Sequence, residues 1–123
     1  MNNSIENSRW DALEKKEQEQ NEKECIADLS TGDLSDETFN KLFALSEEFR
    51  QSEEIKNSME LGFCSLLSRR EPHDAFKFKE KYNLSNDFVA AAAKKNYDFL
   101  MSRSEIAKTD AVFAKIVKDV FNL

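Results

Sequence analysis

The sequence predicts an all-α protein: a compact bundle of about five helices, preceded by a polar N-terminal helix. Apolar residues recur at three- to four-residue spacing through most of the chain, which is the period of a helix with one buried face. Several of these segments begin with a serine followed by acidic residues, the pattern of a helix N-terminus. The 123 residues include only two glycines and one proline, whereas a sheet protein needs many turn formers.

Length and composition indicate one domain with an appended segment. A chain of 123 residues suits a single fold. With 40% hydrophobic and 34% charged residues, it is too apolar for a disordered chain and too charged for a membrane protein. We therefore divide it into a polar N-terminal segment or helix, residues 1–29, and a helical bundle domain, residues 30–123.

The N-terminal segment is polar, and its first nine residues are expected to fray. Propensities favour a helix from Trp10 to Leu29, yet residues 14–24 contain no apolar side chain, so most of this helix is expected to be solvated and partly ordered. Three residues would attach it to the body: Cys25, Ile26 and Leu29. In the alternative interpretation the segment is an arm that folds against a partner, with Trp10 and Leu13 as anchors. The usual solvation of polar stretches favours the first interpretation.

The first two helices of the bundle have clear N-terminal signals. Ser35 is expected to cap one helix, and Ser52 is expected to cap the next, over residues 54–69. The apolar face of the first helix would contain Phe39, Leu42, Phe43, Leu45, Ser46 and Phe49. Helix 54–69 is apolar over most of its circumference, which predicts a central position, with Gly62 allowing a neighbouring helix to approach closely.

Three more helices are expected after Pro72, which ends helix 54–69. They cover residues 74–82, 86–101 and 109–122, and the turn between the first two ends in a cap at Ser85. The main face of the helix over 86–101 would comprise Phe88, Val89, Ala92, Phe99 and Leu100. Tyr97 and Met101 would project away from that face and need another contact.

Several function classes have no support in the sequence. The longest apolar run, residues 88–93, is far shorter than the roughly 20 residues of a membrane span. One histidine and two distant cysteines offer neither a zinc site nor a disulfide framework, and no glycine-rich loop is present to hold phosphates. We therefore expect a cytoplasmic protein that is not an enzyme and has no metal or other cofactor.

The segment over residues 75–95 resembles a helix-turn-helix, with Asn83 at the turn. Its candidate nucleic-acid contacts are Lys77, Lys79, Asn86, Lys94 and Lys95. Lys79 occupies the position where a small residue is usual, and Asp87 stands in the first turn of the second helix, where an arginine would serve recognition. A hairpin used only for helix contacts explains the same spacing and is favoured.

The charge distribution also argues against nucleic acid. Residues 1–69 carry 8 Lys and Arg against 16 Asp and Glu, a net charge of −8, whereas residues 70–123 carry 10 against 8, a net charge of +2. An acidic surface repels phosphates, so nucleic acid is an unlikely partner and could approach only the second half.

These observations together predict a small intracellular protein-interaction protein: an adaptor, an inhibitor, an immunity-type protein or a secretion chaperone. Its partner would be another protein, with a basic surface that suits the acidic half. The candidate partner-binding residues are Trp10, Leu13, Leu61, Tyr97 and Met101. A homodimer would use the same residues for its contact. The alternative is a transcriptional regulator that binds nucleic acid through residues 75–95.

Overall fold

The computed structural model describes the backbone of residues 2–123 and the side chains from Arg9 onward. These residues form an all-α bundle with no strand, as the sequence predicts. The helices are α1 (Asn2–Ser30), α2 (Asp36–Phe43), α3 (Glu47–Arg50), α4 (Glu53–Ser68), α5 (Pro72–Tyr82), α6 (Asn86–Ser102) and α7 (Lys108–Phe121).

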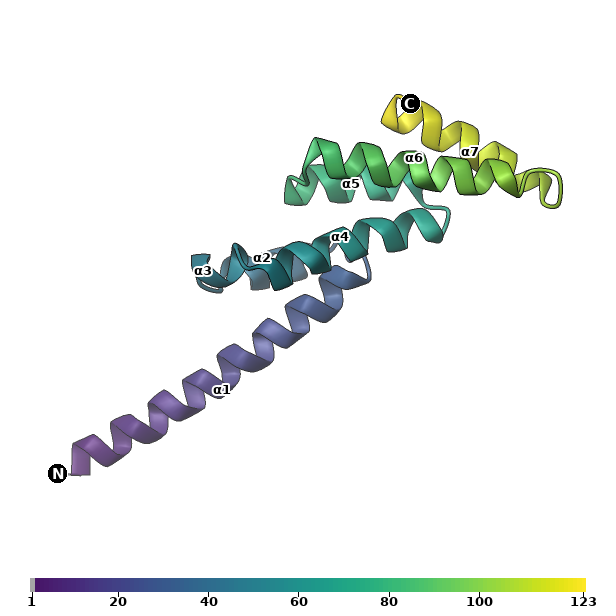
Figure 1. Ribbon diagram of the computed structural model, residues 1–123. Coiled ribbons are helices and arrows are strands. Elements are labelled where there is room, and N and C mark those ends of the chain that lie inside the picture. Colours follow the sequence, from purple (N-terminus) through teal and green to yellow (C-terminus); the bar gives the residue numbers. More distant parts are fainter. Residues whose placement is uncertain (1) are drawn as a thin grey trace.

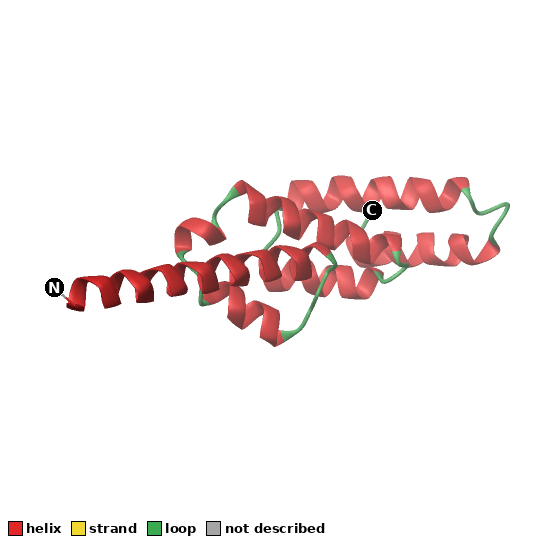
Figure 2. Cartoon of the chain, turned by 90° about the horizontal axis from the view of Figure 1, so that it is seen from below, coloured by secondary structure: helices red, strands yellow, loops and turns green. Residues whose placement is uncertain are grey.

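Helix α4 lies at the centre of the molecule (Figure 1). It contacts the C-terminal part of α1 on one side and both α5 and α6 on the other, while α7 lies against α5 and α6. The central position predicted for residues 54–69 is therefore confirmed. The first half of α1 extends well beyond the rest of the molecule in both views (Figures 1 and 2).

The contact between α1 and α4 depends on two glycines. A Cβ atom on Gly62 would overlap the carbonyl oxygen of Leu29 and lie 2.9 Å from Cζ of Phe78. Gly32 has a φ of +81°, and a Cβ there would lie 2.6 Å from Cγ of Leu66. The end of α1 and the turn after it therefore lie directly on α4, and the close approach predicted at Gly62 is confirmed.

Serine caps begin four of the helices. Ser35, Ser52 and Ser85 each accept a hydrogen bond from the backbone N–H three residues later, which confirms three predicted caps. Ser46 does the same for Phe49 and begins α3. The single helix predicted across this region is therefore two helices, and the assignment of Ser46 to an apolar face was wrong. A serine whose side chain binds the backbone stops one helix and starts another.

Two other boundaries differ from the prediction. Helix α1 begins at Asn2, so the backbone of residues 2–9 is helical where fraying was expected; a helix that is already formed extends at little further cost. Helix α5 begins at Pro72, two residues earlier than expected, because proline suits the first turn, where its missing N–H has no partner to lose.

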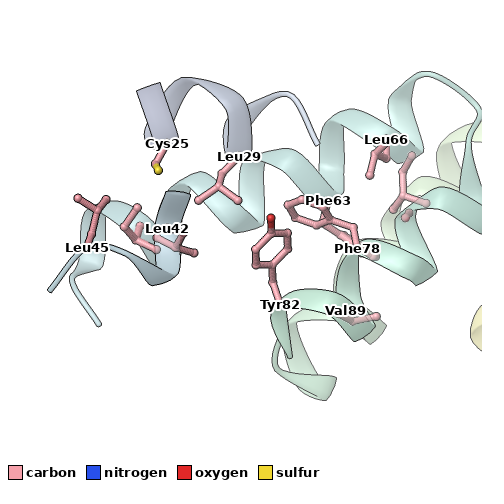
Figure 3. Packing of buried hydrophobic residues seen from close by; sticks show 12 residues of the cluster. Cys25, Leu29, Leu42, Leu45, Phe63, Leu66, Phe78, Tyr82 and Val89 are labelled. Atoms are coloured by element: carbon pink, nitrogen blue, oxygen red, sulfur yellow. The ribbon is translucent and has the colours of Figure 1, made fainter. Parts of the chain in front are cut away.

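The hydrophobic core has two clusters that meet at Phe121. The larger cluster joins α1, α2, α4, α5 and α6, and Figure 3 shows Cys25 and Leu29 of α1 pointing toward it. Burial of these two residues, with Ile26 against the cluster, confirms the predicted attachment of α1. The smaller cluster consists of Ala93, Leu100, Ala114 and Val117, between α6 and α7. Phe121 contacts both clusters.

A buried ion pair fixes the α6–α7 hairpin to the end of α4. The Asp110 side chain is only 6% exposed and accepts hydrogen bonds from Nε of Arg103 at 3.1 Å and from Nη2 of Arg70 at 3.4 Å. Arg70 follows α4, and Arg103 follows α6. Asp110 was predicted only as part of the start of the last helix. Its two arginine partners satisfy a charge that would be costly to bury alone.

The hydroxyl group of Tyr82 points into the larger cluster (Figure 3). It is buried and has no hydrogen-bond partner among the described residues. Burial, with a smaller contribution from the nearby carboxylate of Asp33, raises the pKa of Tyr82 to about 12. The hydroxyl therefore contributes no hydrogen bond to the folded state, and its ionisation opposes folding.

We expect Tyr82→Phe to leave the free energy of unfolding unchanged at pH 7 or to increase it by up to about 1 kcal/mol. Because the pKa of Tyr82 is higher in the folded state than in the unfolded state, ionisation of Tyr82 leaves the stability of the wild type unchanged below about pH 10 and reduces it as the pH rises toward 12. The variant has no tyrosine at this position and does not lose stability in this way. Urea unfolding between pH 7 and 11 measures both effects, and a clear destabilisation at pH 7 would show that the hydroxyl has a partner after all.

Candidate functional site

An open groove runs between α4 and α6 and has a volume of about 580 Å³. Its lining is mostly apolar and comprises Cys64, Leu67, Ser68, Phe88, Ala91, Ala92, Lys95, Asn96 and Phe99. A second cavity of about 320 Å³ shares Phe88 and reaches Lys56 and Met59, which lie nearer the start of α4. The residues of α6 that line the larger cavity run from Phe88 to Phe99, about 16 Å at 1.5 Å per residue. We name this larger cavity the α4–α6 groove.

The alanines of α6 explain why the groove is open. Ala91 and Ala92 contribute one methyl group each, so they do not fill the space between the two helices. Helix α6 is held instead through another face, on which Val89, Ala93 and Leu100 are buried against the core and α7. Ala91 is exposed, so no helix of the described chain packs against this side of α6.

The structure corrects the predicted face of α6. Phe99, expected on the main apolar face, is 50% exposed and lines the groove. Tyr97, expected to project away, is partly buried against the smaller cluster. The reason is the helical step: Ala93, Tyr97 and Leu100 follow one another at intervals of four and three residues and share a face, whereas Phe99 does not.

The five predicted partner-binding residues do not form one site. Leu61 is 59% exposed and precedes Cys64 by three residues, so it lies on the same side of α4 as Cys64 but outside the groove lining. Trp10 and Leu13 lie on the projecting part of α1. Met101 is exposed but lies two residues from Phe99, on a different side of α6. Tyr97 is partly buried against the smaller cluster. Sequence analysis missed Phe99 and Ala91, and the run of four alanines was the available signal.

Three polar groups give the groove its chemical character. Burial raises the pKa of the Cys64 thiol, Glu60 raises it further, and Lys95 opposes them, so the thiol stays neutral and serves as an apolar wall. Lys95 is exposed and brings a positive charge to the lining. The Oδ1 atom of Asn96 is buried without a hydrogen-bond partner in the described chain, so an unsatisfied acceptor lies beneath the groove lining.

The projecting part of α1 is a second exposed feature. Every residue from Arg9 to Gln20 is exposed, including Trp10 at 62% and Leu13 at 58%. We name residues 9–20 the arm. Side-chain hydrogen bonds of 3.3 Å from Gln18 to Glu22 and from Gln20 to Glu24 lie along this helix at i,i+4 spacing. Such pairs stabilise a helix only slightly.

The helix-turn-helix-like segment has the predicted turn. Asn83 adopts a left-handed conformation with a φ of 52°, and Leu84 contacts the larger core cluster. Asn86, Lys77, Lys94 and Lys95 are exposed, whereas Lys79 is partly buried with its Nζ 5.5 Å from the centre of the Phe76 ring. Helix α5 lies mainly on α4 and α7, and α6 lies mainly on α7. The two helices of the segment are thus held in the bundle mainly by contacts with other helices and not with each other.

Residues 2–123 contain no helix that is long and apolar enough to cross a membrane. Among the side chains described, no three metal-ligating residues come together, and neither cysteine is in a disulfide. No protein-family model matches this chain, and neither the curated proteins nor the solved structures include one with significant similarity to it. The α4–α6 groove and the arm are therefore the features from which a function can be inferred.

Proposed function

We propose that this is a non-enzymatic intracellular protein that binds an amphipathic helix of another protein in the α4–α6 groove. The observation that carries the proposal is a largely apolar channel between two helices, with Ala91 and Phe99 exposed along it. Insertion of the apolar face of a helix into a groove is a recurrent mode of peptide recognition. An adaptor, an inhibitor, an immunity-type protein or a secretion chaperone would each use it.

The dimensions of the groove suit a helix. Its length of about 16 Å corresponds to about three helical turns. The small side chains of Ala91 and Ala92 would permit a short distance between helix axes, which depends on the residues at the contact. Phe99 and Leu61 stand at its edges as large apolar contacts, and such residues often dominate binding energy when a partner covers them.

The surface charge supports a partner with basic residues outside its apolar stripe. The chain has a net charge of −6, and exposed acidic pairs stand at the starts of α2, α3 and α4. Opposite charges at the rim of an interface accelerate association and select among partners more than they add affinity. The groove then supplies affinity, and the acidic surface supplies selection.

We expect Ala91→Glu to abolish capture of the partner, because the longer side chain would occupy the space that the partner helix enters, and its carboxylate, even beside Lys95 one turn later, would lose its hydration. Ala90→Glu is the matched control: it places the same side chain on the same helix, at an exposed position outside the groove lining. The wild type and both variants are immobilised, and proteins retained from an extract of the source cells are compared by mass spectrometry. A protein retained by the wild type and Ala90→Glu is then purified and titrated calorimetrically.

A loss of affinity of at least about tenfold for Ala91→Glu alone, equivalent to about 1.4 kcal/mol, would support the groove. Equal binding by both variants would contradict it. Because both alanines are exposed, circular dichroism and thermal unfolding should show the same fold in all three proteins.

The nucleic-acid alternative has a separate test. We expect no sequence-specific binding to DNA or RNA at physiological salt, since Asp87 stands in the first turn of α6. Nanomolar binding that weakens steeply with salt and is lost when Lys94 and Lys95 are both replaced by Glu, with the helical spectrum retained, would overturn our proposal. Fluorescence anisotropy with labelled oligonucleotides measures it.

A further inference from the structure

We infer that the α4–α6 groove is occupied, in the absence of another partner, by the arm of a second copy of this chain. This inference rests on the proposed function, because it assigns an occupant to the same groove. The arm offers Trp10 and Leu13, two large apolar side chains that are 62% and 58% exposed. The groove offers an apolar lining that the rest of its own chain leaves open.

The arm on its own has little to stabilise it. All residues from Arg9 to Gln20 are exposed, and the nearest part of the body is an open cavity that Glu14, Glu17 and Gln18 line together with residues 44–46. A polar helix with so little tertiary contact is marginal in water. Tryptophan usually buries much of its large apolar surface. A surface that covers Trp10 and Leu13 would therefore stabilise the helix as well as the contact.

The arm cannot reach the groove of its own chain. Helix α1 crosses α4 at Gly62, and Ser65 also faces it, donating a hydrogen bond of 3.1 Å to the Ser30 carbonyl oxygen. The groove uses Cys64 and Leu67, which lie on another side of α4. Because α1 is one continuous helix, its arm points away from the molecule (Figure 1). The groove must therefore be filled in trans.

The two surfaces are chemically complementary. Glu14 follows Trp10 by one helical turn, and Glu17 follows Leu13 by one turn, so carboxylates continue the anchor face. Lys95 supplies the opposite charge in the groove lining.

Reciprocal exchange would produce a closed dimer. Each copy supplies one arm and one groove, so two-fold symmetry satisfies both at once, whereas a one-way contact would extend into a chain of molecules. The dimer would cover the groove until a partner helix displaces the arm.

The experiment uses Trp10 as an internal probe, because it is the single tryptophan of the sequence. Its fluorescence and the mass from light scattering are measured on the full chain across a dilution series. We expect the emission to shift to shorter wavelength with increasing concentration as the mass rises toward double the 14.2 kDa of one chain. Leu13→Gln and Ala91→Glu should each abolish both changes. Ala12→Gln and Ala90→Glu, exposed neighbours on other sides of their helices, should retain them.

A monomer at every concentration would overturn the inference, and so would a dimer that persists in Ala91→Glu. Failure of this inference is distinct from failure of the proposed function. If the partner still binds the wild type and Leu13→Gln but not Ala91→Glu, the groove binds a partner and the arm does not occupy it. If the arm docks but partner capture is insensitive to Ala91→Glu, only the proposed function fails.

Discussion

The close crossing of α1 over α4 at Gly62 determines the arrangement of the rest of the molecule. The Leu29 carbonyl oxygen occupies the space of a missing side chain, and Phe78 of α5 reaches the same point from the other direction. Three helices therefore meet at one glycine. The crossing fixes α1 on one side of α4, directs its first half away from the body and leaves the other side of α4 to α5 and α6.

Two helices have more apolar surface than the fold buries, and the candidate site follows from that surplus. Helix α4 buries Phe63 and Leu66 but leaves Leu61 largely exposed, and α6 buries Val89 and Leu100 but leaves Phe99 half exposed. Asp110, held by Arg70 and Arg103, ties the α6–α7 hairpin to the end of α4. The walls of the groove are thus two stable helices rather than loops, as a preformed binding site requires.

The sequence predicts local features of the fold well. Ser35, Ser52 and Ser85 are recognisable caps because their signal lies within four residues, and Gly62 stands out as a glycine on an apolar helix face. The choice of buried face on α6 was not predictable, because Phe99 and Tyr97 both belong to apolar stripes and only the positions of α4 and α7 decide between them. The groove was not predictable for the same reason, because it exists where no neighbouring helix covers α4 and α6. Leu61, by contrast, is exposed, as a residue expected to contact a partner must be.

The most direct test of the crossing is the free energy of unfolding of the Gly62→Ala variant, measured by urea titration. In an unconstrained helix interior, alanine is more favourable than glycine by about 1 kcal/mol. At the crossing, the added methyl group meets the Leu29 backbone, which no side-chain rotation can relieve, so we expect a net destabilisation of about 1–3 kcal/mol or more. Leu61→Ala, at the exposed neighbouring position, should change stability by less than about 1 kcal/mol. A Gly62→Ala protein as stable as the wild type, or more stable, would contradict the crossing on which the fold, the open groove and the projecting arm depend.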